Sequence, residues 1–215
     1  MRQKPIRDRI MYRLRILYGF VVFVIVFIFS PNADAFNIYR AGDVIVGQEY
    51  NDVLKSWFDR EFSIWAGKSE NGTEYLVFKG DTGLGDATVW VLDSPYLRKK
   101  LKKALEKAIE WSDIARESQA DTSKNLGCFG SGKFGICEVN RSSLKKNQMG
   151  LSFFATNGGK QTNLIITMID TDNQFTKATI YFDLLQMRNL LKAFKGIETA
   201  FEKARKTERD QELFK

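Results

Sequence analysis

Histidine is absent from this chain of 215 residues, and cysteine occurs only twice. Without histidine, the sequence excludes catalytic triads, metal sites and general-base chemistry that depend on an imidazole. Two cysteines that pair with each other leave no thiolates for a zinc site. No linear pattern of carboxylates points to catalysis either. We therefore expect a protein that is not an enzyme and that binds no cofactor and no metal ion.

The first 35 residues have the features of a secretory signal peptide. Six basic residues precede an uncharged apolar run at residues 16–29, and Ala33-Asp34-Ala35 then offers small residues where a signal peptidase reads them. The run is shorter than the roughly 20 residues that suit a membrane span. We expect cleavage before Phe36 and a location in the periplasm or outside the cell. The alternative is an uncleaved leader that anchors the protein to the inner membrane.

The leader also carries much of the positive charge. The chain has 33 basic and 26 acidic residues, and removing the 6 basic and 2 acidic residues of the leader lowers the net charge from +7 to +3. The high isoelectric point is therefore weak support for a polyanionic partner.

Both cysteines, Cys128 and Cys137, lie after the leader and flank a glycine-rich segment. In an oxidising compartment this spacing indicates a disulfide across a hairpin or a short loop. It differs from the C-x-x-C spacing of redox enzymes. A disulfide that closes so short a loop contributes about 2–3 kcal/mol to stability.

After the leader, the sequence repeats itself with a period of about 90 residues. At an offset of 91, residues 87–90 (Ala-Thr-Val-Trp) fall on residues 178–181 (Ala-Thr-Ile-Tyr), and at 89, Ser63 and Ala66 fall on Ser152 and Ala155. A period this long indicates one supersecondary unit used twice. We expect one globular domain at 36–215, with repeats at about 42–117 and 132–206 and a linker at 118–131.

Each repeat is predicted to contain about four strands and one long helix. In the first repeat, the strands are expected at 44–46, 62–67, 74–79 and 87–92, with a helical turn or loop at 51–60. In the second, they are expected at 134–139, 150–155, 163–169 and 178–182. The helices start near Ser94-Pro95 and Asp183 and carry apolar stripes at helical spacing; the second is expected to continue into 202–215.

These elements predict an α+β fold of two tandem ββββα units. Short turns favour antiparallel hairpins over crossover connections. One four-stranded sheet with a single helix leaves apolar faces open, so we expect the two units to pack with pseudo-twofold symmetry, their antiparallel sheets covered by the two long helices.

The first helix has a strongly basic face. Six basic residues lie within ten positions: Arg98, Lys99, Lys100, Lys102, Lys103 and Lys107. They are suited to contact phosphates, but we favour the interpretation that they form a solvated helix face beside Glu106 and Glu110. The second helix keeps Arg188, Lys192 and Lys195 and is less basic.

Two aromatic pairs recur between the repeats, Trp65 with Phe154 and Trp90 with Tyr181. Aromatic residues on strands usually pack in a core or across strands, and exposed ones can stack on bases. Exposure in one continuous groove would favour nucleic acid, and burial beneath the helices would disfavour it.

The tandem layout resembles the Pur-alpha repeat and the Whirly domain. The matching segments are residues 62–65 before Asn71-Gly72, then 75–78, 87–90 and the helix from Pro95. The resemblance implies paired units that bind single-stranded nucleic acid on their sheets. This sequence lacks the lysine-rich motif of Whirly proteins, so no binding residue is carried over.

Two functions follow from these observations. The first is an exported, non-enzymatic interaction protein, an accessory or structural component of an envelope or secretion assembly that binds an unidentified protein partner. The alternative is a single-stranded nucleic-acid-binding protein that acts outside the cytoplasm. The charge of +3 without the leader favours the first, and contact with a membrane is expected only through an uncleaved leader.

Overall fold

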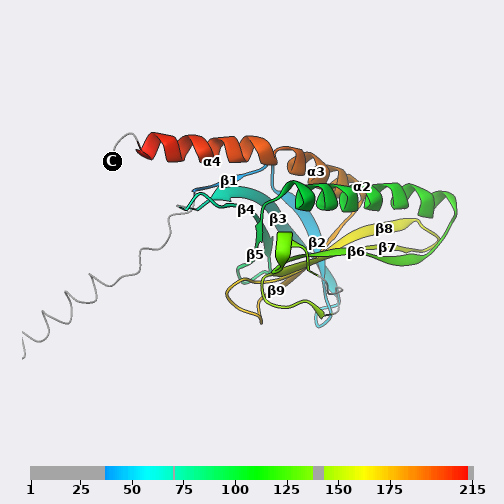
Figure 1. Cartoon of the computed structure of the whole chain (residues 1–215). Helices are drawn as coiled ribbons and strands as arrows, with labels where there is room; N and C mark the ends of the chain where they lie inside the picture. The colour runs from blue at the N-terminus through cyan, green and yellow to red at the C-terminus, as the bar shows by residue number, and fades with distance from the viewer. Residues whose placement is uncertain (1–36, 70, 138–142, 213–215) are drawn as a thin grey trace, which may run out of the picture. The chain divides into compact units, whose positions relative to one another are not determined.

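A computed structural model describes residues 37–69, 71–137 and 143–212 (Figure 1). The predicted signal peptide, residues 1–35, lies outside them. The described residues belong to a compact unit from Phe36 to Lys215. In chain order the elements are β1 (Asn37–Arg40), β2 (Ile45–Asn51), β3 (Ser56–Lys68), β4 (Glu74–Asp81), β5 (Asp86–Leu92), α2 (Pro95–Glu117), β6 (Thr122–Gly130), η1 (Lys133–Gly135), β7 (Gln148–Thr156), β8 (Gln161–Ile169), β9 (Lys177–Phe182), α3 (Leu184–Lys195) and α4 (Ile197–Glu212).

The strands form one curled antiparallel sheet in the order β5-β4-β3-β2-β9-β8-β7-β6, and β1 pairs with the end of β3. Strands β2–β5 make one meander and β6–β9 a second. The two meanders join where Gln48 of β2 lies opposite Tyr181 of β9. Their apolar faces share one buried core. The two meanders approach each other closely there, because a Cβ added at Gly80 of β4 would lie only 3.2 Å from the Ile180 side chain of β9. The predicted α+β class with antiparallel strands and covering helices is confirmed.

Each long helix covers mainly the meander that it does not follow in the chain. Helix α2 follows β5 but packs on β6, β7 and β8, whereas α4 follows β9 but packs on β3 and β1 (Figure 1). The ring of Trp111 on α2 lies 5.7 Å from that of Phe153 on β7. Arg205 on α4 forms an ion pair with Glu74 of β4 at 2.6 Å. The helices therefore tie the two meanders together.

The outer edge of β5 is closed by residues from the second half of the chain, just before β7 and just after β8. Asn147 accepts a hydrogen bond from the Trp90 N–H (2.7 Å) and donates one to the Trp90 carbonyl (3.0 Å). Asp170 accepts one from the Thr88 N–H (2.7 Å), and the Thr171 N–H donates to the Thr88 carbonyl (2.8 Å). Because exposed strand edges recruit other strands, these contacts both protect β5 and hold the curl of the sheet.

The second helix is broken into α3 and α4 at Gly196, where the chain between β1 and β2 passes close by. A Cβ at Gly196 would lie 3.4 Å from the Gly42 nitrogen, and one at Gly42 would lie 2.8 Å from the Ala193 Cα. Gly42 also has a φ of +80°. Glycine permits this close approach because it has no side chain.

The segment 51–60 is neither the helical turn nor the loop that the sequence favours. Only residues 52–55 form a turn, and β3 begins at Ser56. The first half of β3 pairs with β2, with Trp57 directly opposite Tyr50. Apolar alternation is missing because most of these side chains are exposed.

The segments 118–131 and 134–139 also differ from the sequence prediction. Strand β6 lies in segment 118–131, where a linker was expected. The described part of segment 134–139, where the first strand of the second repeat was expected, consists of the end of η1 and the two residues after it. Phe134 has a φ of +61°, a left-handed conformation incompatible with a strand. Val139 lies outside the described residues.

The predicted disulfide joins Cys128 at the end of β6 to Cys137, with Cα atoms 5.1 Å apart. No helix in the described part of the chain combines the length and the apolar character that crossing a membrane requires.

Candidate binding surfaces

Aromatic side chains cross the outer surface of the sheet where the two meanders join. Tyr50 and Trp57 face each other across β2 and β3 with ring centroids 5.2 Å apart. The Trp57 ring also lies 5.2 Å from that of Tyr181 on β9, nearly perpendicular to it. Beyond Tyr181 lies its partner Ile165 on β8, which is buried; Phe154 on β7 lies on the same side of the sheet, opposite Asn163 and two positions along from the partner of Ile165. We call Val46, Tyr50, Trp57, Tyr181 and Phe154 the aromatic sheet face.

Much of the aromatic sheet face is open to solvent. Trp57 is 51 % exposed and Val46 is 45 % exposed, and Tyr50 and Phe154 are also exposed. The alternation of the strands explains this placement, since the neighbouring residues Ile45, Phe62 and Ile180 point into the core. The sequence prediction missed Trp57 because it lies in the supposed loop. An aromatic residue on each side of the turn 52–55 is the signal that marks the hairpin.

The two repeated aromatic pairs do not share one groove. Tyr181 and Phe154 belong to the aromatic sheet face, whereas Trp65 and Trp90 lie on the outer surface of the first meander, on either side of Val77. Trp65 is half-buried, and Lys79 and Arg40 lie over its ring at 4.9 and 6.0 Å. These aromatics point away from the core that the helices cover.

Of the six basic residues predicted on the first helix, Arg98 has a structural role. It forms ion pairs of 2.6 Å with Asp93 and with Glu198 of α4, and its guanidinium lies 4.8 Å from the Phe201 ring centre. Hydrogen bonding to Asp93 raises the pKa of Arg98, against the opposing effect of burial. Hydrogen bonds from Arg98 and Arg205 lower the pKa of Glu198. Arg98 thus joins α2 to α4.

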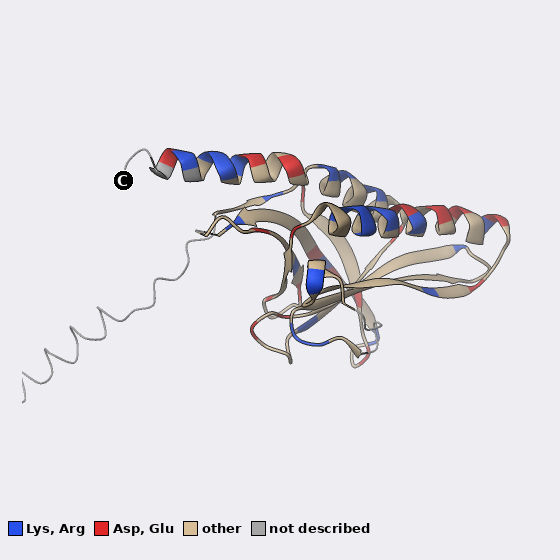
Figure 2. Ribbon diagram, viewed as in Figure 1, with Lys and Arg blue, Asp and Glu red and all other residues tan. Residues whose placement is uncertain are grey.

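The other five predicted residues are exposed on α2: Lys99, Lys100, Lys102, Lys103 and Lys107. Lys102 lies 3.6 Å from Glu106. Figure 2 shows basic residues gathered on the first half of α2 and on α3, which packs beside it, and acidic residues on the second half of α2. The exposed side chains Arg188, Lys192 and Lys195 of α3 therefore extend the basic surface of the helix layer.

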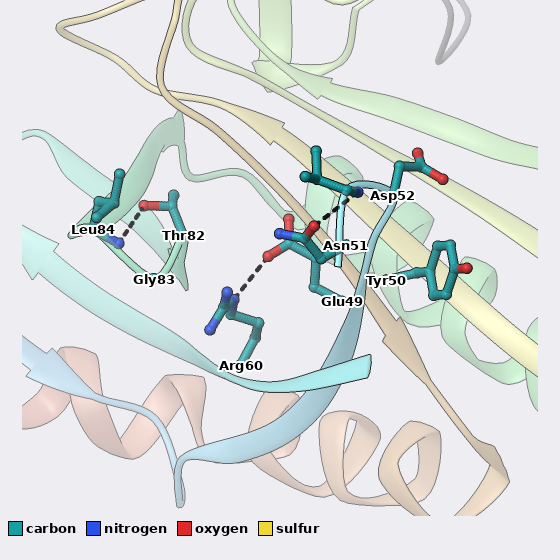
Figure 3. A pocket seen from close by; sticks show the side chains of 9 residues that line it. Glu49, Tyr50, Asn51, Asp52, Arg60, Thr82, Gly83 and Leu84 are labelled. Atoms are coloured by element: carbon teal, nitrogen blue, oxygen red, sulfur yellow. Dashed lines mark hydrogen bonds and ion pairs between the residues drawn. The ribbon is translucent and has the colours of Figure 1, made fainter. Parts of the chain in front are cut away.

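A hollow of about 460 Å³ separates the β2–β3 turn from the β4–β5 turn (Figure 3). At its base Arg60 donates to Glu49 (2.8 Å) and lies 3.7 Å from Asp81. A Cβ at Gly83 would lie 2.7 Å from the Arg60 guanidinium. The two carboxylates balance the charge of Arg60. Because Glu49 lies near the β2–β3 turn and Asp81 at the β4–β5 turn, Arg60 links the two turns.

Within the described ranges, no three His, Cys, Asp or Glu side chains gather in a way that could hold a metal ion. In comparisons with known proteins, no family model, no curated protein and no solved structure matches this chain.

Proposed function

We propose that this protein is an exported, non-enzymatic interaction protein that binds a protein partner of the cell envelope through the aromatic sheet face. The exposed, mutually contacting rings of Tyr50 and Trp57, with the exposed Phe154 on the same side of the sheet, carry the proposal. Tyrosine, tryptophan and phenylalanine are enriched at the centres of protein interfaces, and contiguous exposed apolar surface marks interaction sites. The Cys128–Cys137 disulfide supports export, because disulfides persist in oxidising compartments.

The partner is to be identified by placing a photo-crosslinking residue at Val46, with Phe175 in the β8–β9 turn as the control position. Phe175 is 85 % exposed and lies away from the aromatic sheet face. We expect one adduct from envelope fractions that forms at Val46 and not at Phe175. Mass analysis of the protein recovered from the envelope should show a chain that begins at Phe36.

Affinity for the purified partner then decides the proposal. Trp57→Ala should weaken binding by at least about tenfold, since central interface tryptophans contribute about 2 kcal/mol or more. Phe175→Ala should bind as the wild type does. Equal affinity of Trp57→Ala and the wild type would remove the aromatic sheet face from the interaction.

We infer further that the domain consists of two ββββα units related by pseudo-twofold symmetry. The repeated element order supports this, as does burial at equivalent positions: Ala87 and Ala178 are both buried, and so are Leu97 and Met187. The reciprocal covering of meanders by α2 and α4 is the arrangement that such symmetry would produce.

A further inference from the structure

Aromatic rings and lysine ammonium groups lie along one side of α2, and the surface continues onto η1. Tyr96, Lys100, Lys103 and Lys107 follow one another at steps of three or four residues, which places them on one helix face. The ring of Phe134 on η1 lies 6.3 Å from that of Tyr96. We call this surface, which is distinct from the aromatic sheet face, the aromatic–lysine face.

The rings at this end are strongly exposed for their type. Tyr96 is 52 % and Phe134 is 49 % exposed. Lys100 lies 5.5 Å from the Tyr96 ring centre, and Lys133 lies 5.3 Å from that of Phe134. Each ring is therefore an apolar surface with a positive charge beside it.

The disulfide loop fixes Phe134 in this position. Gly135 packs so closely on β5 that a Cβ there would lie 2.3 Å from a Val91 methyl group. The Cys137 N–H donates to the Cys128 carbonyl at 3.1 Å, beside the disulfide. Phe134 itself has a left-handed backbone conformation, which costs free energy in a residue other than glycine. The surrounding contacts hold the ring outward in spite of that cost.

The opposite end of the same helix side repeats the combination. Lys107 lies 4.9 Å from the Trp111 ring centre. Trp111 and the exposed Ile114 line an apolar hollow of about 220 Å³, to which Lys124 of β6 also contributes. From Tyr96 to Ile114 the helix advances about 27 Å at 1.5 Å per residue. Apolar groups thus stand at both ends of the face, with three lysines and the exposed Glu110 between them.

We propose that the aromatic–lysine face docks on an anionic membrane surface, with α2 parallel to the bilayer. Lysines near an anionic leaflet are attracted to its headgroups, and aromatic side chains favour the boundary between headgroups and acyl chains. Helices that lie in the plane of a bilayer combine lysines with apolar and aromatic groups that enter the interface; because the apolar stripe of α2 is buried in the core, Tyr96 and Phe134 would supply those groups here. Long lysine side chains let the charge stay at the phosphates while the rings enter the interface.

Sedimentation with lipid vesicles tests the proposal. The protein used is residues 36–215, which contain the core cluster from Ala41 to Phe201 that the described residues form and lack the apolar leader. Vesicles made of two parts phosphatidylcholine and one part phosphatidylglycerol should bind it, and pure phosphatidylcholine vesicles should not. Added salt should weaken the binding, because it screens exposed charges.

Variants locate the docking surface. Changing Lys100, Lys103 and Lys107 together to Glu should lower vesicle binding by at least about a hundredfold, given the contribution of each lysine near an anionic surface. The matched control changes the exposed Lys160, Lys177 and Lys203 to Glu and should lose much less.

The rings are tested separately, with Phe134→Asn, because asparagine tolerates the left-handed backbone, and with Tyr96→Ala. A protein that carries both substitutions should bind the anionic vesicles about tenfold or more weakly than the wild type. Phe134→Tyr and Phe175→Ala should bind them as the wild type does. Thermal unfolding of each variant verifies the fold.

Three results would overturn the proposal. One is equal binding to neutral and anionic vesicles, and another is wild-type binding by the triple lysine variant. The third is salt-dependent binding of a single-stranded oligonucleotide, lost in the same variants, by a protein that does not bind vesicles; this would assign the face to nucleic acid.

Discussion

Asp170 connects strand β5 to the β8–β9 turn through one carboxylate. It accepts hydrogen bonds from the N–H groups of Thr88, Asp172 and Asn173 at 2.7–2.9 Å. Burial raises the pKa of this carboxyl, but the backbone donors outweigh that effect, and the pKa lies below its usual value. The ionised form therefore stabilises the fold above the pKa of an unfolded aspartate, and this contribution is lost as the pH falls through the lower, folded-state pKa.

Asp170→Asn should lower the free energy of unfolding by about 1–3 kcal/mol at neutral pH, because it removes a charged acceptor of several hydrogen bonds. The difference from the wild type should shrink in acid, where the wild-type Asp170 carboxyl becomes protonated and, like the amide of the variant, carries no charge. Urea unfolding at neutral pH and below pH 3.8, the ordinary pKa of the group, measures both. Asp172→Asn, at an exposed neighbouring position, is the control. A difference that does not change with pH would contradict this assignment.

Single residues also show where sequence reasoning reaches its limit. The basic face of α2 was predictable, since helical spacing and charge are local properties. The role of Arg98 was not, because its partner Glu198 lies one hundred positions further along the chain. The proximity of Phe134 to Tyr96 likewise depends on the fold of the disulfide loop.

At the scale of elements, the break between α3 and α4 depends on two glycines of unequal importance. Gly42 combines a φ of +80° with a Cβ position 2.8 Å from the Ala193 Cα, whereas Gly196 has an ordinary helical backbone and a nearest Cβ distance of 3.2 Å, to the Ala193 carbonyl. Gly42→Ala should therefore cost more than about 2 kcal/mol, and Gly196→Ala clearly less. Urea midpoints of the two variants compare them directly, and the reverse order would be inconsistent with these contacts.

Strands were predictable where one face is buried and unpredictable where both faces meet solvent. Strand β5 alternates between core and exterior, and its bounds agree with the prediction within one residue. In β6, residues 122–125 are polar and mostly exposed, because β6 is the last strand of the sheet path. The sequence prediction also missed the first half of β3, because side chains on both of its faces are exposed or only partly buried.

At the scale of the whole molecule, the reciprocal covering by α2 and α4 makes each meander depend on a helix from the other half of the chain. The closed edge of β5 adds a second connection between the halves. Neither half buries its core alone, so we expect them to unfold as one cooperative unit.

Spectroscopy can test this cooperativity, because the four tryptophans (Trp57, Trp65, Trp90 and Trp111) all precede β6. Tryptophan fluorescence therefore reports on the first half and, through Trp57 beside Tyr181 and Trp111 beside Phe153, on its contacts with the second half. Far-UV circular dichroism follows the secondary structure of both halves. The two urea transitions of residues 36–215 should coincide. A fluorescence transition separated from the circular dichroism transition would show that the halves unfold independently.

The closure of β5 also has a consequence for the order of synthesis. Ribosomes build the chain from its N-terminus, so β5 is complete well before Asn147 and Asp170 exist. Until then, the backbone groups of Thr88 and Trp90 lack the partners that they have in the finished protein. A nascent chain at this stage presents a strand edge that another nascent chain can pair with. The yield of folded protein should therefore fall as the rate of expression rises, even though the edge of β5 is hydrogen-bonded in the finished domain.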